Sequence, residues 1–163
     1  MEFESIIRNK KFSESLIQHA ARRKKDRSNP FVRIGFKSSN NMEIDQNIRS
    51  NKIPLEVISK LGKELDLNDQ KVYMLVNISS STVSRRKKEG KGLNSDEAGR
   101  VYRIASIISL AESTLGEHER SIRWLKTPAK FLGGAVPLEL LVTEAGADEV
   151  RKLLLRIEHS VYS

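Results

Sequence analysis

The chain has 163 residues, of which 38% are hydrophobic and 31% are charged, so it can form one compact domain or two small ones with a modest core. The absence of cysteine excludes a disulfide framework and a thiolate metal site. No apolar run reaches the ~18 residues of a membrane span, and the N-terminus lacks the basic-then-apolar order of a signal peptide. A cytoplasmic protein is therefore expected.

The net charge of +8 is unevenly distributed along the chain. Residues 1–95 hold 20 Lys and Arg against 11 Asp and Glu, a balance of +9, whereas residues 96–163 hold 9 and 10, a balance of −1. A strongly basic segment is typical of proteins that bind polyanions. The alternative is a basic tail that only keeps the protein soluble. The two halves are thus expected to have different tasks.

Residues 1–41 carry the weakest pattern and are expected to form a basic, partly flexible N-terminal extension. Apolar residues at helical spacing predict a helix over 4–22. Five of the six residues in 22–27 are basic, and such a run either stays solvated or contacts DNA as an arm. The alternation of apolar residues in 31–36 permits a short strand, and the composition of 37–41 is that of a loop.

From about residue 42 onward, the spacing of apolar residues and the capping residues are almost wholly helical. The predicted helices cover 42–51, 54–66, 69–76, 80–88, 96–115, 117–125, 137–141 and 148–159. The longest apolar stripe belongs to 96–115, for which Ser95 is the expected N-cap and Gly116 the end. Residues 89–92, the stretch from Pro128 to Gly134 and residues 143–147 are expected connectors. The predicted fold class is all-α, with at most one small strand element.

Residues 68–88 have the layout of a helix-turn-helix, two short helices joined by a tight turn. Asn77 stands where a left-handed residue is needed, Ile78 can fill the corner, and Val83 is the one apolar residue of the second helix. The remaining positions of that helix are short-polar at its start and basic beyond it. The residues predicted to contact DNA are Ser80, Ser81, Thr82, Ser84, Arg85, Arg86 and Lys88.

Small hydroxyl groups at the start of such a helix, and an Arg one turn further on, suit base edges in the major groove, whereas later Lys and Arg side chains suit phosphates. The alternative is an ordinary exposed basic helix. Reading a palindromic site would require two copies of the chain, and the apolar stripe of 101–115 is long enough to serve as a dimer seam as well as a core. A homodimer is therefore expected.

The last forty residues, which begin "WLKTPAKFLGGAVPLELLVTEAGADEV" and end "RIEHSVYS", resemble the C-terminal domain of the Xre/MbcA/ParS antitoxins of bacterial type II toxin–antitoxin pairs. The upstream stretch 84–97 is similar to the family's helix-turn-helix, so the resemblance covers about 45–163. The matching residues of the C-terminal motif are Trp124, Leu125, Pro128, Leu132, Gly133, Gly134, Pro137, Leu140, Leu141, Thr143, Gly146, Ala147, Arg156, Ile157, Glu158, His159, Val161 and Tyr162.

This resemblance implies a DNA-binding domain over 42–95 and a toxin-binding domain over 96–163. Family members bind a toxin, commonly a RES-domain protein that resembles ADP-ribosyltransferases and acts on NAD, and their C-terminal end lies over its substrate cleft. They also repress their own operon by binding operator DNA. The residues that the resemblance assigns to toxin binding are Trp124, Arg156, Glu158, His159, Val161 and Tyr162.

Three departures from the family pattern stand out: Ser160 replaces the usual Gly of the terminal motif, Asn77 replaces the usual turn Gly, and "KIP" at 52–54 replaces "GLP". Two alternatives stay open. The protein can be a helix-turn-helix regulator whose second half only dimerises. Equally, Ile157, Val161 and Tyr162 can pack the last helix onto Trp124 instead of reaching a partner.

An enzymatic role is not expected. His19, His118 and His159 lie far apart in sequence and have no metal-ligand spacing. The Gly-rich stretch 131–137 lacks the Lys and the Ser or Thr of a phosphate loop, and no Ser has a recognisable base beside it. Neither a cofactor nor a metal ion is therefore predicted.

Overall fold

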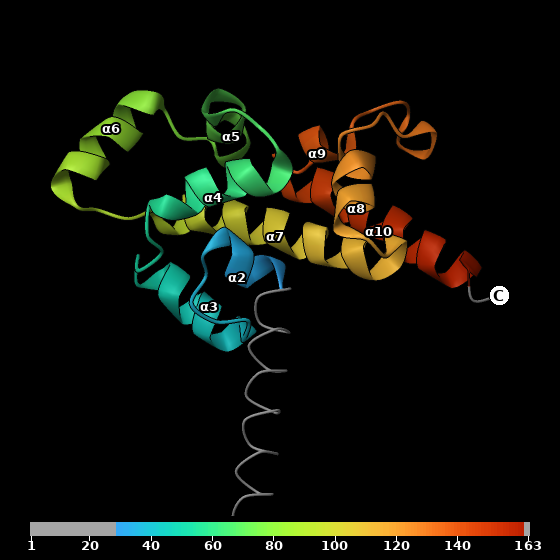
Figure 1. Cartoon of the computed structure of the whole chain (residues 1–163), viewed down its shortest axis with the longest axis horizontal. Coiled ribbons are helices and arrows are strands. Elements are labelled where there is room, and N and C mark those ends of the chain that lie inside the picture. Colours follow the sequence, from blue (N-terminus) through green and yellow to red (C-terminus); the bar gives the residue numbers. More distant parts are fainter. Residues whose placement is uncertain (1–28, 162–163) are drawn as a thin grey trace, which may run out of the picture.

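The computed structural model describes residues 29–161, and the side chains of 29–159 (Figure 1). The predicted helix over 4–22 and the basic run 22–27 lie outside the described residues. Within the described range the fold is all-α, without a strand. No helix in this range combines the length and apolar character needed to cross a membrane.

The helices surround one long central helix, α7 (Ser95–Leu115). The elements before it are α2 (Pro30–Ile34), α3 (Asn41–Arg49), α4 (Glu56–Leu65), α5 (Asp69–Val76) and α6 (Ser80–Glu89). The elements after it are α8 (His118–Leu125), the short 3-10 turn η1 (Lys130–Leu132), α9 (Pro137–Leu140) and α10 (Glu144–Val161). Both groups pack on α7: α2, α3, α4 and α5 from the first, and α8 and α10 from the second. Most predicted helices are confirmed to within two residues.

The start of α7 is fixed by a reciprocal capping box. The Asn94 side-chain oxygen accepts a hydrogen bond from the Glu97 backbone N–H at 2.8 Å, and the Glu97 carboxylate accepts one from the Asn94 N–H at 2.9 Å. The prediction of Ser95 as the N-cap was therefore wrong by one residue. An Asn with a Glu three positions later satisfies two orphan donors, whereas Ser95 has Ala98 at that position.

Most of the apolar stripe of α7 is buried in the core of a single protomer. The stripe residues with no exposed surface are Val101, Ile104, Ala105, Ile108 and Ala111. Such side chains cannot also contact a second copy, so this part of the stripe does not form the predicted dimer seam, whereas Leu110 and Leu115 of the same stripe are only half-buried. The length of the stripe reflects two groups of helices that cover the same helix from different sides.

The predicted strand at 31–36 is instead the helix α2. The Asn29 side chain accepts from the Phe31 N–H at 2.9 Å, Pro30 occupies the first helical turn, and Gly35 ends the helix with a φ of 109°. These are start and stop signals of a short helix, and they outweigh the alternation of apolar residues. The ring of Phe31 lies 5.4 Å from that of Tyr102 on α7, which attaches α2 to the central helix.

The predicted connector 143–147 is the first turn of α10. The Thr143 hydroxyl oxygen accepts from the Gly146 N–H at 3.0 Å, and the helix begins at Glu144. A Cβ on Gly146 would lie 2.1 Å from the carbonyl oxygen of Leu140. Gly146 is thus needed for the close approach of α9 to α10 and does not interrupt the helix.

The buried apolar residues form one cluster that extends from Phe31 to Leu154. A boundary at 95/96 coincides with the start of α7, and α7 contributes buried side chains to the packing of both chain halves. Any division of the chain into two functional parts therefore concerns its surfaces, because the described residues share a continuous core.

Candidate functional site

The helix-turn-helix is formed by α5 and α6. Asn77 ends α5 with a φ of 56°, and its N–H reaches the carbonyl groups of the last turn. Ile78 is buried in the corner between the helices, as predicted. Ser79 is the N-cap of α6, and its Oγ accepts from the Thr82 N–H at 3.1 Å. Val83 packs against the core as the apolar residue of the second helix.

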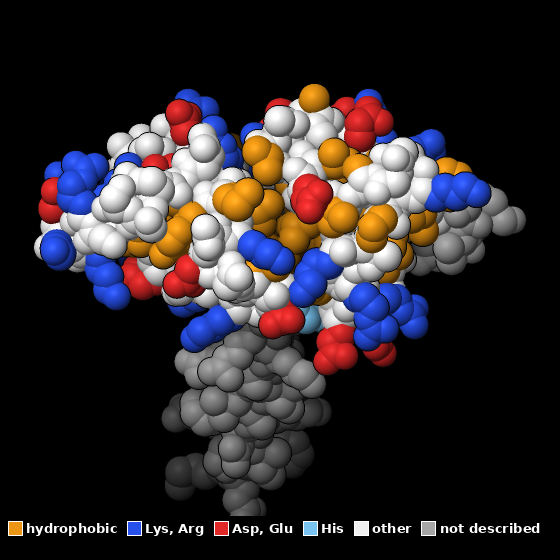
Figure 2. Space-filling model, turned by 90° about the horizontal axis from the view of Figure 1, so that it is seen from above, with side chains coloured by type: hydrophobic (Ala, Val, Ile, Leu, Met, Phe, Trp, Pro, Cys, Tyr) orange, Lys and Arg blue, Asp and Glu red, His pale blue; other side chains and the backbone are white. Residues whose placement is uncertain are grey.

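The outer face of α6 is polar and basic. Figure 1 places α6 at one end of the elongated molecule, and Figure 2 shows Lys and Arg side chains gathered at that end. The residues of α6 that are exposed and carry a hydroxyl or a positive charge are Ser80, Ser81, Ser84, Arg85, Lys87 and Lys88. This surface has the order expected for base contacts followed by phosphate contacts.

Two of the residues predicted to contact DNA have a different position. Arg86 points toward α7, where its guanidinium pairs with the Glu97 carboxylate and lies 3.4 Å from the Gly92 carbonyl oxygen. The side chains of Arg86 and Glu97 are only 15% and 7% exposed. The Thr82 hydroxyl lies 2.8 Å from the Ser79 Oγ, within the cap. Arg86 therefore holds α6 against α7 and does not face outward.

At the opposite end of the molecule, α10 contacts the short turn η1, and Trp124 of α8 lies near the same part of α10. A groove of about 520 Å³ lies between them. Its lining residues are Trp124, Ala129, Lys130, Phe131, Leu153, Arg156 and Ile157. The structure thus brings together three residues of the antitoxin-like motif, from α8 and α10. Glu158 is half-buried and His159 is exposed in the last turns of α10, whereas the Val161 side chain and Tyr162 lie outside the description.

Phe131 is a residue that the sequence reasoning missed. Its side chain is 80% exposed, although it is large and apolar. The loop around it is closed by hydrogen bonds from the Ala129 N–H to the Ala135 carbonyl at 2.9 Å and from the Gly134 N–H to the Ala129 carbonyl at 3.0 Å. The sequence signal for its exposure is the position of an aromatic residue in a Gly-rich connector, which has no apolar helical face to bury the ring.

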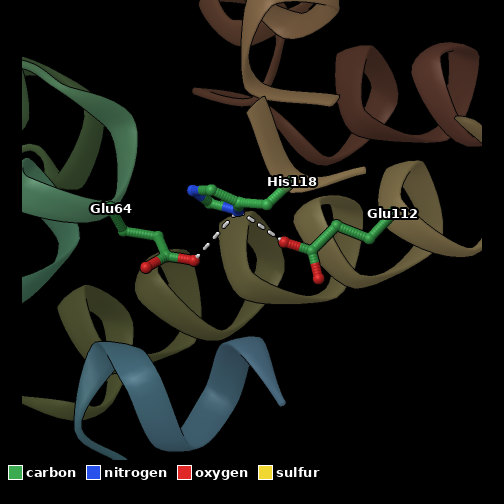
Figure 3. Close-up of side chains that lie close together, drawn as sticks. All are labelled: Glu64, Glu112 and His118. Carbon is green, nitrogen blue, oxygen red and sulfur yellow. Dashed lines mark hydrogen bonds and ion pairs between the residues drawn. The ribbon is translucent and has the colours of Figure 1, made fainter. Parts of the chain in front are cut away.

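A polar cluster joins α2, α4, α7 and α8 (Figure 3). His118 Nδ1 lies 2.7 Å from a Glu112 oxygen and 3.6 Å from a Glu64 oxygen, a set of atoms that could hold a metal ion. The Arg33 guanidinium pairs with both carboxylates, at 2.6 Å from Glu64. Burial lowers the pKa of Arg33, but the two carboxylates outweigh burial and raise this pKa above its ordinary value. The Arg33 guanidinium pairs with carboxylates from two helices, and we interpret this cluster as a structural link between four helices.

Comparisons with known proteins give matches to both of the segments that contain these surfaces. A family model described as the antitoxin Xre-like helix-turn-helix domain matches residues 48–106, and one described as the antitoxin Xre/MbcA/ParS C-terminal toxin-binding domain matches residues 110–159. An antitoxin Xre of Photorhabdus laumondii is 30% identical over 142 residues, which cover 85% of this chain and 95% of that protein. The chain belongs to the Xre antitoxin family.

Two further relatives of this antitoxin share parts of its length. An antitoxin Xre of Pseudomonas putida is 34% identical over 76 residues, 47% of this chain and 48% of that protein. A protein of a Sphingobium species named Prs ADP-ribosylating antitoxin is 27% identical over 105 residues, 58% of this chain and 66% of that protein.

Membership of the family makes this protein a toxin–antitoxin component with a DNA-binding helix-turn-helix and a toxin partner. The outer face of α6 lies within the helix-turn-helix match, and every residue that lines the groove beside α10 lies within the toxin-binding match. The helix α2 and most of α3 precede both matches. They are additions that pack on the same central helix.

Proposed function

We propose that this antitoxin binds and blocks a RES-type toxin that consumes NAD or transfers ADP-ribose, and that it represses its own operon by binding operator DNA. The observation that carries the proposal is the separation of two surfaces, the basic face of α6 at one end and the last turns of α10 at the other. The Sphingobium relative, whose name refers to ADP-ribosylation, supports a partner that uses NAD. The antitoxin itself acts by binding and has no catalytic role.

The DNA-binding task belongs to residues 42–95. Ser80, Ser81 and Ser84 present hydroxyl groups, and Arg85 adds a guanidinium that suits guanine. Lys87 and Lys88 follow at the C-terminal end of α6, where they can contact phosphates and supply affinity without sequence preference. Arg86 is excluded from this set, since its partner is Glu97. Two copies of the antitoxin would read half-sites about 34–36 Å apart, or a multiple of that distance.

The toxin-blocking task belongs to residues 96–163. Arg156, Glu158 and His159 offer charged and hydrogen-bonding groups near the C-terminal end of α10. Such groups suit the polar pocket of an enzyme that binds a nucleotide. Val161 and Tyr162 follow and would add an apolar anchor with a polar tip. Trp124 supports the same end of the molecule from α8.

Co-expression with the toxin encoded beside the antitoxin gene tests this function in the cytoplasm, where we expect both proteins to act. Induction of the toxin alone should stop growth and deplete NAD, and the antitoxin should restore both. A shift assay with the DNA upstream of the operon should show binding by the antitoxin alone. If the antitoxin shifts the DNA but neither binds nor neutralises the toxin, the alternative holds, and the protein is a regulator whose second half only dimerises.

A further inference from the structure

We infer that the groove between the η1 loop and α10 is a separate anchor point for the toxin, which accepts an apolar side chain flanked by a carboxylate. This inference rests on the proposed function, because the occupant is the toxin itself. The groove adjoins the last turns of α10 but does not depend on residues beyond Ile157. It would therefore bind toxin surface next to the substrate cleft, with Arg156 at the border between the two contacts.

The first observation is the orientation of two neighbouring side chains in the loop. Leu132 packs against the core, whereas Phe131 points away from it with 80% of its surface exposed. Gly133 and Gly134 have φ values of 67° and 83°, so the chain turns immediately after Leu132. The closed loop holds Phe131 beside the groove, and an ordered exposed aromatic is typical of an interface anchor.

The second observation is the distribution of charge. Trp124, Leu153 and Ile157 line the groove from α8 and α10, and Lys130 and Arg156 are the charged residues of its lining. Both cations are exposed, and no acidic residue lines this groove. An apolar surface beside two positive charges favours a partner segment with an apolar side chain next to an Asp or Glu.

Two other occupants fit less well. In a symmetric contact centred on the groove, the grooves of the two copies would face each other, which would bring Lys130 and Arg156 close to their own counterparts. Like charges oppose that contact. DNA would meet an apolar surface, and Figure 1 places this groove's helices, α8 and α10, away from α6. All lining residues fall within the toxin-binding match, which favours the toxin.

The test compares Phe131→Ala and Lys130→Glu with the unchanged full-length antitoxin, using the purified toxin of the same operon in a calorimetric titration. Phe131→Ala should raise the Kd about 10- to 30-fold, as expected for an aromatic anchor. Lys130→Glu should raise it about tenfold, by an amount that falls as salt is added. Met42→Ala is the matched control, since Met42 is 77% exposed on α3 and should change the Kd less than twofold.

Each outcome decides a different point. Phe131 is exposed, so Phe131→Ala should leave the melting temperature and the DNA shift unchanged. A Kd within twofold of the original for Phe131→Ala would overturn the anchor while leaving the proposed function intact. If the unchanged antitoxin does not bind the toxin at all, the proposed function and the anchor fail together. A loss of dimer mass in Phe131→Ala would assign the groove to a second copy and would also overturn the inference.

Discussion

Replacement of Arg86 by Met separates a structural role for this residue from a DNA-contacting one. The substitution removes the guanidinium but keeps an unbranched apolar stem that can pack between α6 and α7. Glu97 would then remain as a carboxylate with 5% of the residue exposed and without its cationic partner. Loss of one member of a buried ion pair costs about 3–5 kcal/mol, because the other charge stays buried and unpaired.

The structure places the expected cost at the lower end of that range. The Glu97 carboxylate keeps the backbone N–H of Asn94 as a hydrogen-bond donor at 2.9 Å. We therefore expect Arg86→Met to lower the free energy of unfolding by about 3 kcal/mol. At about 2–4 °C for each kcal/mol, the melting temperature should fall by roughly 6–12 °C. Urea unfolding followed by circular dichroism measures the free energy directly.

A second substitution tests the cause of the loss. Glu97→Gln removes the unpaired charge, and Gln can still take part in the capping box with Asn94. The double variant Arg86→Met/Glu97→Gln should therefore regain about 1–2 kcal/mol relative to Arg86→Met alone. Arg85→Ala is the control, because Arg85 is exposed on the neighbouring position of α6 and should alter stability by less than about 0.5 kcal/mol.

The reasoning would be refuted by the opposite pattern. If Arg86→Met leaves the free energy of unfolding unchanged and weakens DNA binding as much as Arg85→Ala does, then Arg86 faces the DNA. The pairing with Glu97 would then not hold α6 in place.

Three further predictions concern the DNA surface, the fit of α10 and the assembly. Arg85→Ala should cost about 1–3 kcal/mol of binding free energy at one base position of the operator. Lys88→Ala should weaken binding to all DNA sequences alike and reduce the salt dependence of the affinity, and titrations with several operator variants measure both effects. Gly146→Ala should lower the free energy of unfolding by more than about 2 kcal/mol, because the added Cβ would meet the Leu140 carbonyl oxygen. Ala145→Gly is the control at an exposed neighbouring position, and it should cost about 1 kcal/mol or less in the same denaturation assay. Light scattering should show a dimer on operator DNA, and a strict monomer both free and on DNA would contradict the two-copy mode of binding.

Much of the fold was predictable because its signals are local. Asn77, Ile78 and Val83 define the helix-turn-helix through turn chemistry and one apolar contact, and the structure has each of them in the expected environment. Some wrong predictions concern positions where two local signals compete. Asn94 and Ser95 are both good capping residues, and only the Glu three positions after Asn94 distinguishes them.

Other features depend on packing that no local pattern reveals. Gly146 has the composition of a connector, and its role becomes visible only when the Leu140 carbonyl lies against it. Phe131 stands in a loop, where apolar periodicity says nothing about exposure. Arg86 is an intermediate case: it follows Val83 by three residues and so lies on the same face of α6, which indicates an inward position. Its partner Glu97 comes from another helix and could not be inferred from that spacing.

The measurement that tests the separation of DNA and toxin surfaces most directly is inhibition of the toxin's NAD consumption by an antitoxin shortened after Leu155. The residues of α10 with no exposed surface, Ala147, Val150 and Leu154, all precede the deletion, so the shortened protein should fold and shift operator DNA normally. It should inhibit the toxin at least about tenfold more weakly than the full-length antitoxin, because Arg156 and the residues after it are gone. Equal inhibition by the shortened and full-length proteins would contradict the assignment of toxin blocking to the end of α10.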